Sequence, residues 1–202
     1  PKGTTIADTV KVCQWMEQAG VDAIHVSNGN SFPHPRNPAG DMPVEESAKT
    51  YDSMLSSGTK TFRNYLALRG KLTGALFKRA WEKPHGGRIE GANLPDSEAI
   101  KRAVRIPVIC TGGFQTASAI REAISRGQCD AVSIARSLVA NPNLVEMFRQ
   151  GLDRAPLPCS YCNKCLVNAV ENPLGCYDVR RFPSHEAMVK ESMTVFTPAP
   201  FQ

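Results

Sequence analysis

The chain has 202 residues, of which 42% are hydrophobic, which is enough to bury a core of its own and suggests one domain or slightly more. Its net charge is +5, and no apolar run approaches the ~20 residues that a membrane-spanning helix needs. Three of the seven cysteines stand singly in apolar patterns and four cluster near the C-terminus. This distribution argues against a disulfide framework and is typical of a reducing, cytoplasmic compartment.

The first predicted elements are a helix and a strand. Apolar residues at three-residue steps predict an amphipathic helix over 8–19, with Asp8 as its N-cap and Gly20 at its C-terminal end. The β-rich run Val21–Ser27 follows and predicts a strand. A helix, a glycine and a strand in this order form one α/β half-unit.

A long segment, about residues 32–91, then interrupts the α/β rhythm. It opens with four prolines and continues as a helix-like stretch over 45–81. Excursions of this length often shape a binding site. Residues 60–88 are rich in lysine and arginine, a pattern that also occurs in nucleic-acid-binding surfaces. A solvated helical face is the favoured interpretation, because no nucleic-acid motif accompanies the charge.

Two further helix–strand units and a closing helix follow the excursion. They are a helix over 95–104 with the strand Ile106–Cys110, a helix capped by Thr116 with the strand Ala131–Ala135, and a helix that starts at Asn141-Pro142. Strands without polar alternation that are separated by helices predict a parallel sheet covered on its faces. The tail predicts one short helix over 188–196 and then a proline-rich end.

Four cysteines near the C-terminus form the clearest chemical motif. Cys159, Cys162 and Cys165 stand at two-residue gaps, and Cys176 follows after ten intervening residues. Thiolates so spaced can converge on a cubane iron–sulfur cluster. Zinc sites more often use two separated Cys-x-x-Cys pairs, or one pair with histidines. The spacing favours a [4Fe–4S] cluster over zinc, and four reduced cysteines without a metal are the remaining alternative.

Two turns that follow predicted strands carry a second motif. Gly112 and Gly113 follow the second strand, and Arg136 follows the third. Backbone N–H groups of glycines can approach a phosphate closely, and a guanidinium offers it a planar charged fork. The pattern predicts a phosphate site. The alternative is a tight turn beside an arginine that forms a surface salt bridge.

These residues resemble the last third of the old yellow enzyme family. The resemblance rests on the order of a strand, Thr-Gly-Gly-Phe, a helix, Cys-Asp-Ala-Val-Ser-Ile-Ala-Arg and Leu-Val-Ala-Asn-Pro-Asn-Leu over 111–144. The Cys-x-x-Cys-Asn-x-Cys run resembles the iron–sulfur branch of that family, the 2,4-dienoyl-CoA reductase and trimethylamine dehydrogenase type. The resemblance to the family is most specific from Ile106 to Cys176.

The resemblance implies an α/β fold, namely the C-terminal part of an FMN-binding (β/α)8 TIM barrel. Residues 1–157 would supply strands six to eight and the helical excursion, and residues 158–202 the cysteine-cluster extension. The FMN phosphate would contact the residues that match the family's phosphate grip, which are Gly112, Gly113, Ala135 and Arg136. The implied activity is an NAD(P)H oxidoreductase that passes hydride through FMN to an activated C=C substrate.

Histidines add weaker candidates. His25 lies inside the first strand, where it could contact flavin or substrate, although a lone strand histidine is more often a hydrogen-bonded structural residue. His34 and Arg36, between prolines on the following loop, are candidates for reaching the substrate from above.

The resemblance implies a chain that begins after strand five, so the family's groups from earlier strands cannot be placed; the sequence opens at Pro1 rather than methionine. A full barrel needs ~250 residues, so we expect this half to be inactive alone. Its expected partners are the missing N-terminal half or another copy, together with a small-molecule substrate, and neither nucleic acid nor a membrane. Two alternatives are a non-catalytic subunit whose cysteines bind a structural metal, and a small complete phosphate-binding protein.

Overall fold

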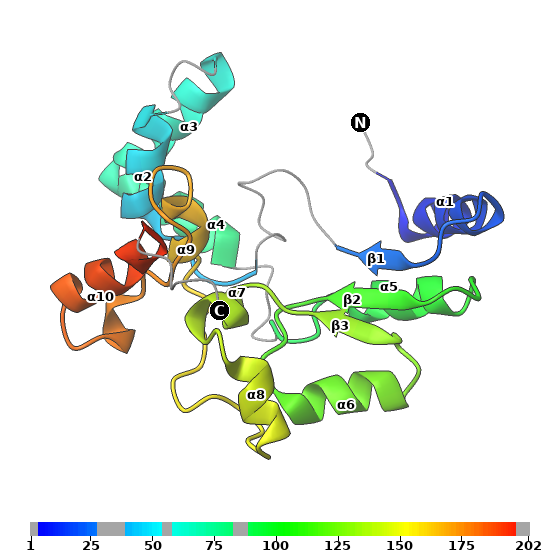
Figure 1. The fold of residues 1–202 in the computed structure, drawn as a ribbon. Coiled ribbons are helices and arrows are strands. Elements are labelled where there is room, and N and C mark those ends of the chain that lie inside the picture. The colour runs from blue at the N-terminus through cyan, green and yellow to red at the C-terminus, as the bar shows by residue number, and fades with distance from the viewer. Residues whose placement is uncertain (1–3, 28–38, 54–57, 83–88, 197–202) are drawn as a thin grey trace. The chain divides into compact units, whose positions relative to one another are not determined.

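The computed structural model describes residues 4–27, 39–53, 58–82 and 89–196 (Figure 1). The chain folds into two compact units. Unit 1 comprises Pro1–Asn30, Gly87–Leu138 and Pro142–Pro158, and unit 2 comprises Ser31–Gly86, Val139–Asn141 and Cys159–Gln202. His34 and Arg36 lie outside the described residues.

Unit 1 contains a three-stranded parallel sheet in the order β1-β2-β3. Its elements are α1 (Ile6–Gln18), β1 (Ile24–Val26), α5 (Leu94–Lys101), β2 (Val108–Thr111), α6 (Ala117–Ser125), β3 (Ala131–Ser133) and α8 (Leu144–Arg149). The three predicted strands and their parallel arrangement are therefore confirmed. A short helix, α7 (Arg136–Ala140), follows β3 and was not predicted.

The two faces of the sheet differ in chemistry. On one face Ile24, Val26 and Val108 pack with residues of α1 and α5 in a continuous apolar core. A neighbouring core joins Cys110 to Phe114 and to α6. Because side chains alternate along a strand, the intervening positions point to the opposite face. There His25 is exposed, and the side chains of β2 and β3 are only half-buried.

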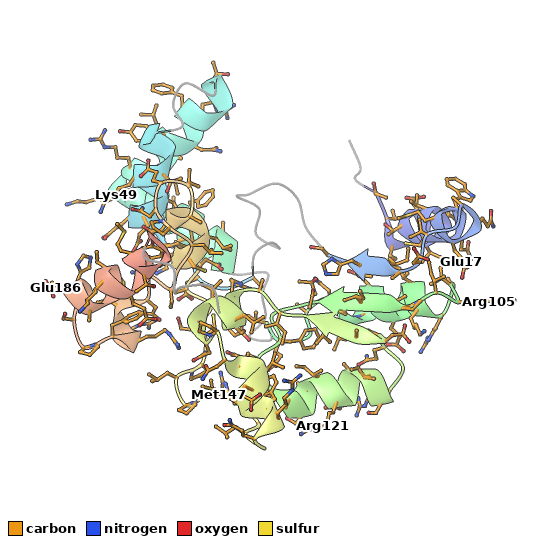
Figure 2. All side chains as sticks on the ribbon, in the orientation of Figure 1. Glu17, Lys49, Arg105, Arg121, Met147 and Glu186 are labelled. Atoms are coloured by element: carbon orange, nitrogen blue, oxygen red, sulfur yellow. The ribbon has the colours of Figure 1, made fainter. Side chains whose placement is uncertain are left out.

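Polar contacts close the ends of unit 1. The Glu17 carboxylate, at the end of α1, accepts hydrogen bonds from the backbone N–H groups of Arg105 (2.7 Å) and Ile106 (3.1 Å). Figure 2 labels Glu17 and Arg105, which lie side by side. Asp130 accepts hydrogen bonds from the Val108 N–H and from the Lys101 ammonium, both at 2.7 Å. The Glu17 bonds join the end of α1 to the segment before β2. The Asp130 bonds join the residue before β3 to the start of β2 and to the end of α5.

Unit 2 is helical in its described residues. Its elements are α2 (Val44–Ser53), α3 (Thr59–Arg69), α4 (Lys71–Glu82), α9 (Lys164–Asn168), η3 (Val179–Arg181), α10 (His185–Ser192) and η4 (Met193–Phe196). A small core of Met42, Tyr65 and Leu68 joins the segment before α2 to α3. The helix-like stretch predicted over 45–81 is therefore three helices, because Gly58 and Gly70 stand at the ends of α3.

Two predicted helix starts were wrong. Thr5, not Asp8, caps α1; Asp8 is the third helical residue and completes a reciprocal capping box by accepting the Thr5 N–H at 3.0 Å. The helix expected from Asn141-Pro142 begins instead at Leu144 after Asn143. A residue that precedes proline is disfavoured in a helix, so Asn141 lies beyond the end of α7.

The tail helix is also displaced from its predicted position. It starts at His185, because the Ser184 hydroxyl accepts the Ala187 N–H and caps it. Among the described helices, none has both the length and the apolar character that crossing a membrane requires.

Candidate functional site

Three side chains meet on the open face of the sheet, one from each strand. The Nε2 atom of His25 on β1 lies 2.7 Å from the hydroxyl oxygens of both Thr111 on β2 and Ser133 on β3, and the two hydroxyls also hydrogen-bond to each other. Thr111 and Ser133 are directly paired in the register. We call these three residues the polar triad.

The polar triad engages one ring nitrogen of His25. Its Nε2 is held by two hydroxyls that can each donate or accept, while Nδ1 makes no hydrogen bond within the described residues. Sequence reasoning singled out His25 but missed Thr111 and Ser133. The available signal was their spacing, two residues after the apolar Ile109 and Ala131, which places polar groups at the strand ends on one face.

The predicted phosphate-binding residues stand directly beyond the polar triad. Gly112 and Gly113 follow Thr111, and Ala135 and Arg136 follow Ser133 at a distance of two and three residues. Since β2 and β3 are parallel and paired, both turns lie at the same edge of the sheet. Ala135 is exposed, and Arg136 is half-buried at the start of α7.

The two glycines are required by close packing. A Cβ on Gly112 would lie 3.3 Å from the backbone nitrogens of Ala92 and Asn93, and a Cβ on Gly113, where φ is +67°, would lie 2.9 Å from Ile89. The Gly91 N–H donates to the Gly112 carbonyl at 2.6 Å. The turn is thus pressed against residues 89–93, which fixes its backbone at the end of β2.

The first turn of α6 cannot serve as the anion site, because its donors are already used. Glu90 accepts the N–H groups of Gln115 and Thr116 at 2.7 Å and the Thr116 hydroxyl. Asp153 accepts the Ser118 N–H at 2.6 Å, and its carbonyl accepts that of Ala117. A phosphate at this edge would therefore be bound by the glycine turn and by Arg136 rather than by the α6 N-terminus.

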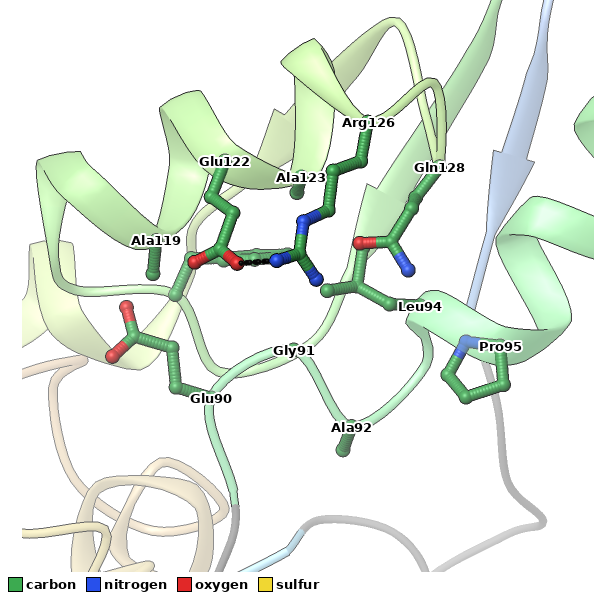
Figure 3. A pocket seen from close by; sticks show the side chains of 11 residues that line it. Glu90, Gly91, Ala92, Leu94, Pro95, Ala119, Glu122, Ala123, Arg126 and Gln128 are labelled. Atoms are coloured by element: carbon green, nitrogen blue, oxygen red, sulfur yellow. Dashed lines mark ion pairs between the residues drawn. The ribbon is translucent and has the colours of Figure 1, made fainter.

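A pocket of about 330 Å³ lies between the loop before α5 and the side of α6 (Figure 3). Its walls include the apolar residues Leu94 and Phe114, which belong to the core beneath β2. An ion pair between Arg126 and Glu122, 2.8 Å apart, closes one side. Its apolar wall belongs to the core on the face of the sheet that the helices cover. The polar triad lies on the opposite, open face, so the pocket and the triad are separate sites.

The four clustered cysteines all belong to unit 2, and none of them forms a disulfide bond. Cys165 is buried and the other three are half-buried. The Tyr161 N–H donates to the sulfur of Cys159 at 3.4 Å. Burial raises the pKa of Cys176, an effect that a backbone hydrogen bond from Asp178 and the nearby Arg181 partly offset. Hydrogen bonds to sulfur are one of the features by which proteins tune iron–sulfur centres.

Asp178, two residues after Cys176, is hydrogen-bonded to Ser160, which directly follows Cys159. Its buried carboxylate accepts the Ser160 hydroxyl at 2.6 Å and both Nε and an Nη of Arg180 at 2.8 Å. The Arg180 bonds, followed by the Ser160 bond, lower the pKa of Asp178 to about 2 against the opposing effect of burial. Within the described residues, however, no three cysteine, histidine or carboxylate side chains are close enough to hold a metal ion together.

Four thiols are suitable ligands for an iron–sulfur cluster. In the described part of the chain, however, they do not lie close enough together to bind one. The three remaining cysteines belong to unit 1 and are packed in its cores. Burial raises the pKa values of Cys13 and Cys129, and raises that of Cys110 to about 11. Thiols with raised pKa values are poor nucleophiles, which agrees with the packing of these three cysteines in apolar cores.

Comparisons with known proteins match part of the chain to one family of flavin enzymes. Residues 77–155 match the model of the NADH:flavin oxidoreductase / NADH oxidase family. The chain is 27% identical over 170 residues to a bilirubin reductase of Mediterraneibacter gnavus, covering 84% of this chain and 20% of that protein. It is 28% identical over 171 residues to the 4,4'-dithiodibutanoate disulfide reductase of Rhodococcus erythropolis, covering 82% and 37%.

An NADH oxidase of Thermoanaerobacter brockii is 23% identical over 202 aligned positions, covering 93% of this chain and 24% of that protein. The chain thus spans between 20% and 37% of the length of these three relatives. The matched segment 77–155 contains β2, β3 and both turns at their ends. Over that segment the chain is similar to the NADH:flavin oxidoreductase / NADH oxidase family.

Proposed function

We propose that this chain is the FMN-phosphate-binding part of an NAD(P)H oxidoreductase that acts on activated C=C bonds. The observation that carries the proposal is the placement of Gly112–Gly113 and Ala135–Arg136 at one edge of a parallel sheet, inside the family segment. FMN, when bound, would supply the hydride-transfer chemistry. The residues of this chain would bind its phosphate and fix its position.

The donors present fit a phosphate. The glycine turn is held rigid by residues 89–93, so its backbone is positioned before the ligand arrives. Arg136 provides a positive charge and a planar set of donors on the adjacent strand end. His25, whose exposed side chain lies on the open face of the sheet, is the residue that we assign to contact with the flavin or the substrate.

The fold proposed for the whole protein is a (β/α)8 barrel in which β1, β2 and β3 are strands six to eight. Support comes from the parallel order of the strands, the helices on one face and the polar open face, which would then line the barrel interior. The partner of this chain would be an N-terminal half that supplies the other strands, or a second copy. Alone, this chain would be inactive.

The test is a titration of the chain, with and without an N-terminal half-barrel of a family member, against FMN and riboflavin. Riboflavin lacks only the phosphate, so it isolates the proposed contact. We expect FMN to bind at least tenfold more tightly, and Arg136→Ala to reduce that difference by about tenfold or more, since a charge-assisted hydrogen bond contributes about 2 kcal/mol. Equal affinity of the unaltered chain for the two ligands would refute the phosphate site.

A second candidate function is a non-catalytic subunit in which Cys159, Cys162, Cys165 and Cys176 hold a structural metal. The hydrogen bond to the sulfur of Cys159 favours it, and a cluster on these residues is also compatible with the flavin enzyme. A cluster, when bound, would supply one-electron transfer or rigidity. Iron or zinc retained by a chain that binds no flavin, even beside the N-terminal half, would support this second function.

A further inference from the structure

The polar triad forms a closed triangle of contacts among three atoms. His25 is paired with Ile109 in the register, so its ring extends along β2 toward the strand end, where its Nε2 lies 2.7 Å from the hydroxyl oxygens of Thr111 and Ser133. The two hydroxyls contact each other and complete the triangle. Each side of the triangle has the length of a hydrogen bond, so each side needs a hydrogen atom between its two atoms.

The supply of hydrogen atoms depends on the tautomer of His25. Each hydroxyl supplies one hydrogen and can accept two bonds, whereas Nε2 carries either one hydrogen or one lone pair. If Nε2 carries the lone pair, the two hydroxyl hydrogens must serve all three sides. One side of the triangle then brings two acceptor atoms together with no hydrogen between them. This arrangement is repulsive at the observed distances.

A hydrogen on Nε2 satisfies every side of the triangle. The N–H is shared between the two hydroxyl oxygens as a three-centre bond, and one hydroxyl donates to the other. No two acceptors then face each other, and the hydrogen of the second hydroxyl is left over. The triangle therefore favours the tautomer with hydrogen on Nε2. In the neutral ring of His25 the lone pair is then on Nδ1.

The strands hold both hydroxyls in place for this task. Thr111 and Ser133 are half-buried and face each other across the β2–β3 pairing. The Asn93 side-chain amide also donates to the Thr111 carbonyl at 2.6 Å, which anchors the end of β2. Threonine is branched at Cβ, so its side chain has few rotamers. The exposed ring of His25 is therefore directed by two hydroxyls that are more firmly held than the ring itself.

We propose that Thr111 and Ser133 are positioning residues that keep the hydrogen of neutral His25 on Nε2, so that His25 meets the flavin as a hydrogen-bond acceptor at Nδ1. The group that this nitrogen takes is one that bears an N–H or O–H. FMN carries such groups on its ring and on its ribityl chain. A bare carbonyl or carboxylate oxygen would set one lone pair against another. The inference rests on the proposed contact of His25 with FMN and gives that contact its polarity.

The test measures the tautomer of His25 in the full chain without any ligand. Nitrogen-15 NMR correlation spectra distinguish a ring nitrogen that carries a hydrogen from one that carries a lone pair. The spectra are recorded at about pH 9, where histidines are ordinarily neutral. The His25 signals are identified by their loss in His25→Asn. His185, which is exposed at the start of α10, provides an internal reference for a histidine in solvent.

Removing either hydroxyl should release the tautomer. With one hydroxyl left, a single contact remains, and a hydroxyl can either accept from an N–H or donate to a lone pair. We expect the share of the Nδ1–H tautomer to rise about fivefold in Thr111→Val and in Ser133→Ala, since one hydrogen bond is lost. Thr111→Ser keeps the hydroxyl and should behave as the unaltered chain. Thr9→Val is the matched control, because it deletes a hydroxyl on α1, which packs against the opposite face.

The outcomes for the ligand-free chain decide the positioning role. Hydrogen mainly on Nε2 of His25, with a shift in the two hydroxyl variants and none in Thr111→Ser or Thr9→Val, supports it. Hydrogen mainly on Nδ1 in the unaltered chain overturns it, and so does a tautomer that both hydroxyl variants leave unchanged or that Thr9→Val shifts equally. Should Thr111→Val fail to fold, as judged by circular dichroism, Ser133→Ala on the neighbouring strand decides alone.

Addition of FMN, together with the N-terminal half-barrel, tests the acceptor role. We expect the Nδ1 signal of His25 to move toward the value of a hydrogen-bonded nitrogen while the hydrogen stays on Nε2. A signal that bound FMN leaves unmoved, or a hydrogen that moves to Nδ1, overturns the acceptor role. If FMN does not bind at all, the proposed function fails, and the ligand-free tautomer still decides whether Thr111 and Ser133 position the ring.

Discussion

The strand ends of unit 1 and the cysteine loop of unit 2 (residues 159–168) place functional groups in different ways. In unit 1, backbone pairing sets the positions: Thr111 and Ser133 face each other because β2 and β3 are in register, and an apolar core holds the opposite face. In unit 2, side-chain hydrogen bonds and one ion pair place the cysteine loop against residues 40–50.

This difference has an energetic consequence. Backbone pairing tolerates changes of side chain, so unit 1 should be sensitive mainly to the loss of apolar volume. A loop held by buried polar contacts should be sensitive to the loss of single hydrogen-bonding groups, because each loss leaves a buried partner unsatisfied. The four predictions below test this contrast, from the largest expected effect to the smallest.

The largest effect is expected from deleting core volume in unit 1. Ile100, 2% exposed on α5, packs against β1 and β2, and Ile100→Ala should lower the free energy of unfolding by about 3 kcal/mol. The control is Ile124→Ala on α6, whose side chain is 42% exposed and should cost far less. Urea denaturation followed by circular dichroism measures both, and equal costs would contradict an apolar basis for unit 1.

Next in size is the loss of one polar anchor in unit 2. Asn163→Ala removes the bond to Asp41 and places a poor left-handed former at φ 60°, so we expect a cost of about 2 kcal/mol. Asn172→Ala, on an exposed part of the same unit, is the control and should change stability little. Hydrogen exchange of the amides in α9 reports the local effect, and unchanged protection there would show that the anchor is dispensable.

A smaller effect should follow from changing the polar triad. Thr111→Val preserves shape but removes a hydroxyl that contacts both His25 and Ser133, and the expected cost is about 1 kcal/mol. Because the strands are held by backbone pairing, the sheet itself should remain intact. Imidazole NMR shifts of His25 should change, since its Nε2 loses one of two partners. An unaltered His25 spectrum would argue against the triad.

The smallest effect concerns pH. The hydrogen bond from Lys101, then that from the Val108 backbone, lowers the pKa of Asp130 below its ordinary value of 3.8. A lowered pKa means that the carboxylate stabilises the fold above pH 3.8 and that this contribution is lost as the pH falls through the lower folded-state value. The stability difference between the unaltered chain and Asp130→Asn should therefore shrink on acidification below about pH 4. A constant difference in urea denaturation across that range would contradict the assignment.

Much of unit 1 could be predicted from local sequence patterns. Apolar runs bounded by glycines identified all three strands, and the Thr-Gly-Gly turn and Arg136 marked the segment that the family model matches. Helix ends were less accurate, because a cap depends on which side chain reaches the first free N–H group; Thr5 and Asp8 do so together in α1.

The sequence by itself determined the order of strands and helices, the spacing of the four cysteines and the turn at Gly112–Gly113, because these depend on neighbours along the chain. Only the tertiary structure decided which distant groups meet. It brought Thr111 and Ser133 to His25, gave the donors at the start of α6 to Glu90, and joined Asp41 to Asn163. A hydrogen bond across 122 residues leaves no periodic signal in the sequence, since its two ends are related only by how the chain packs.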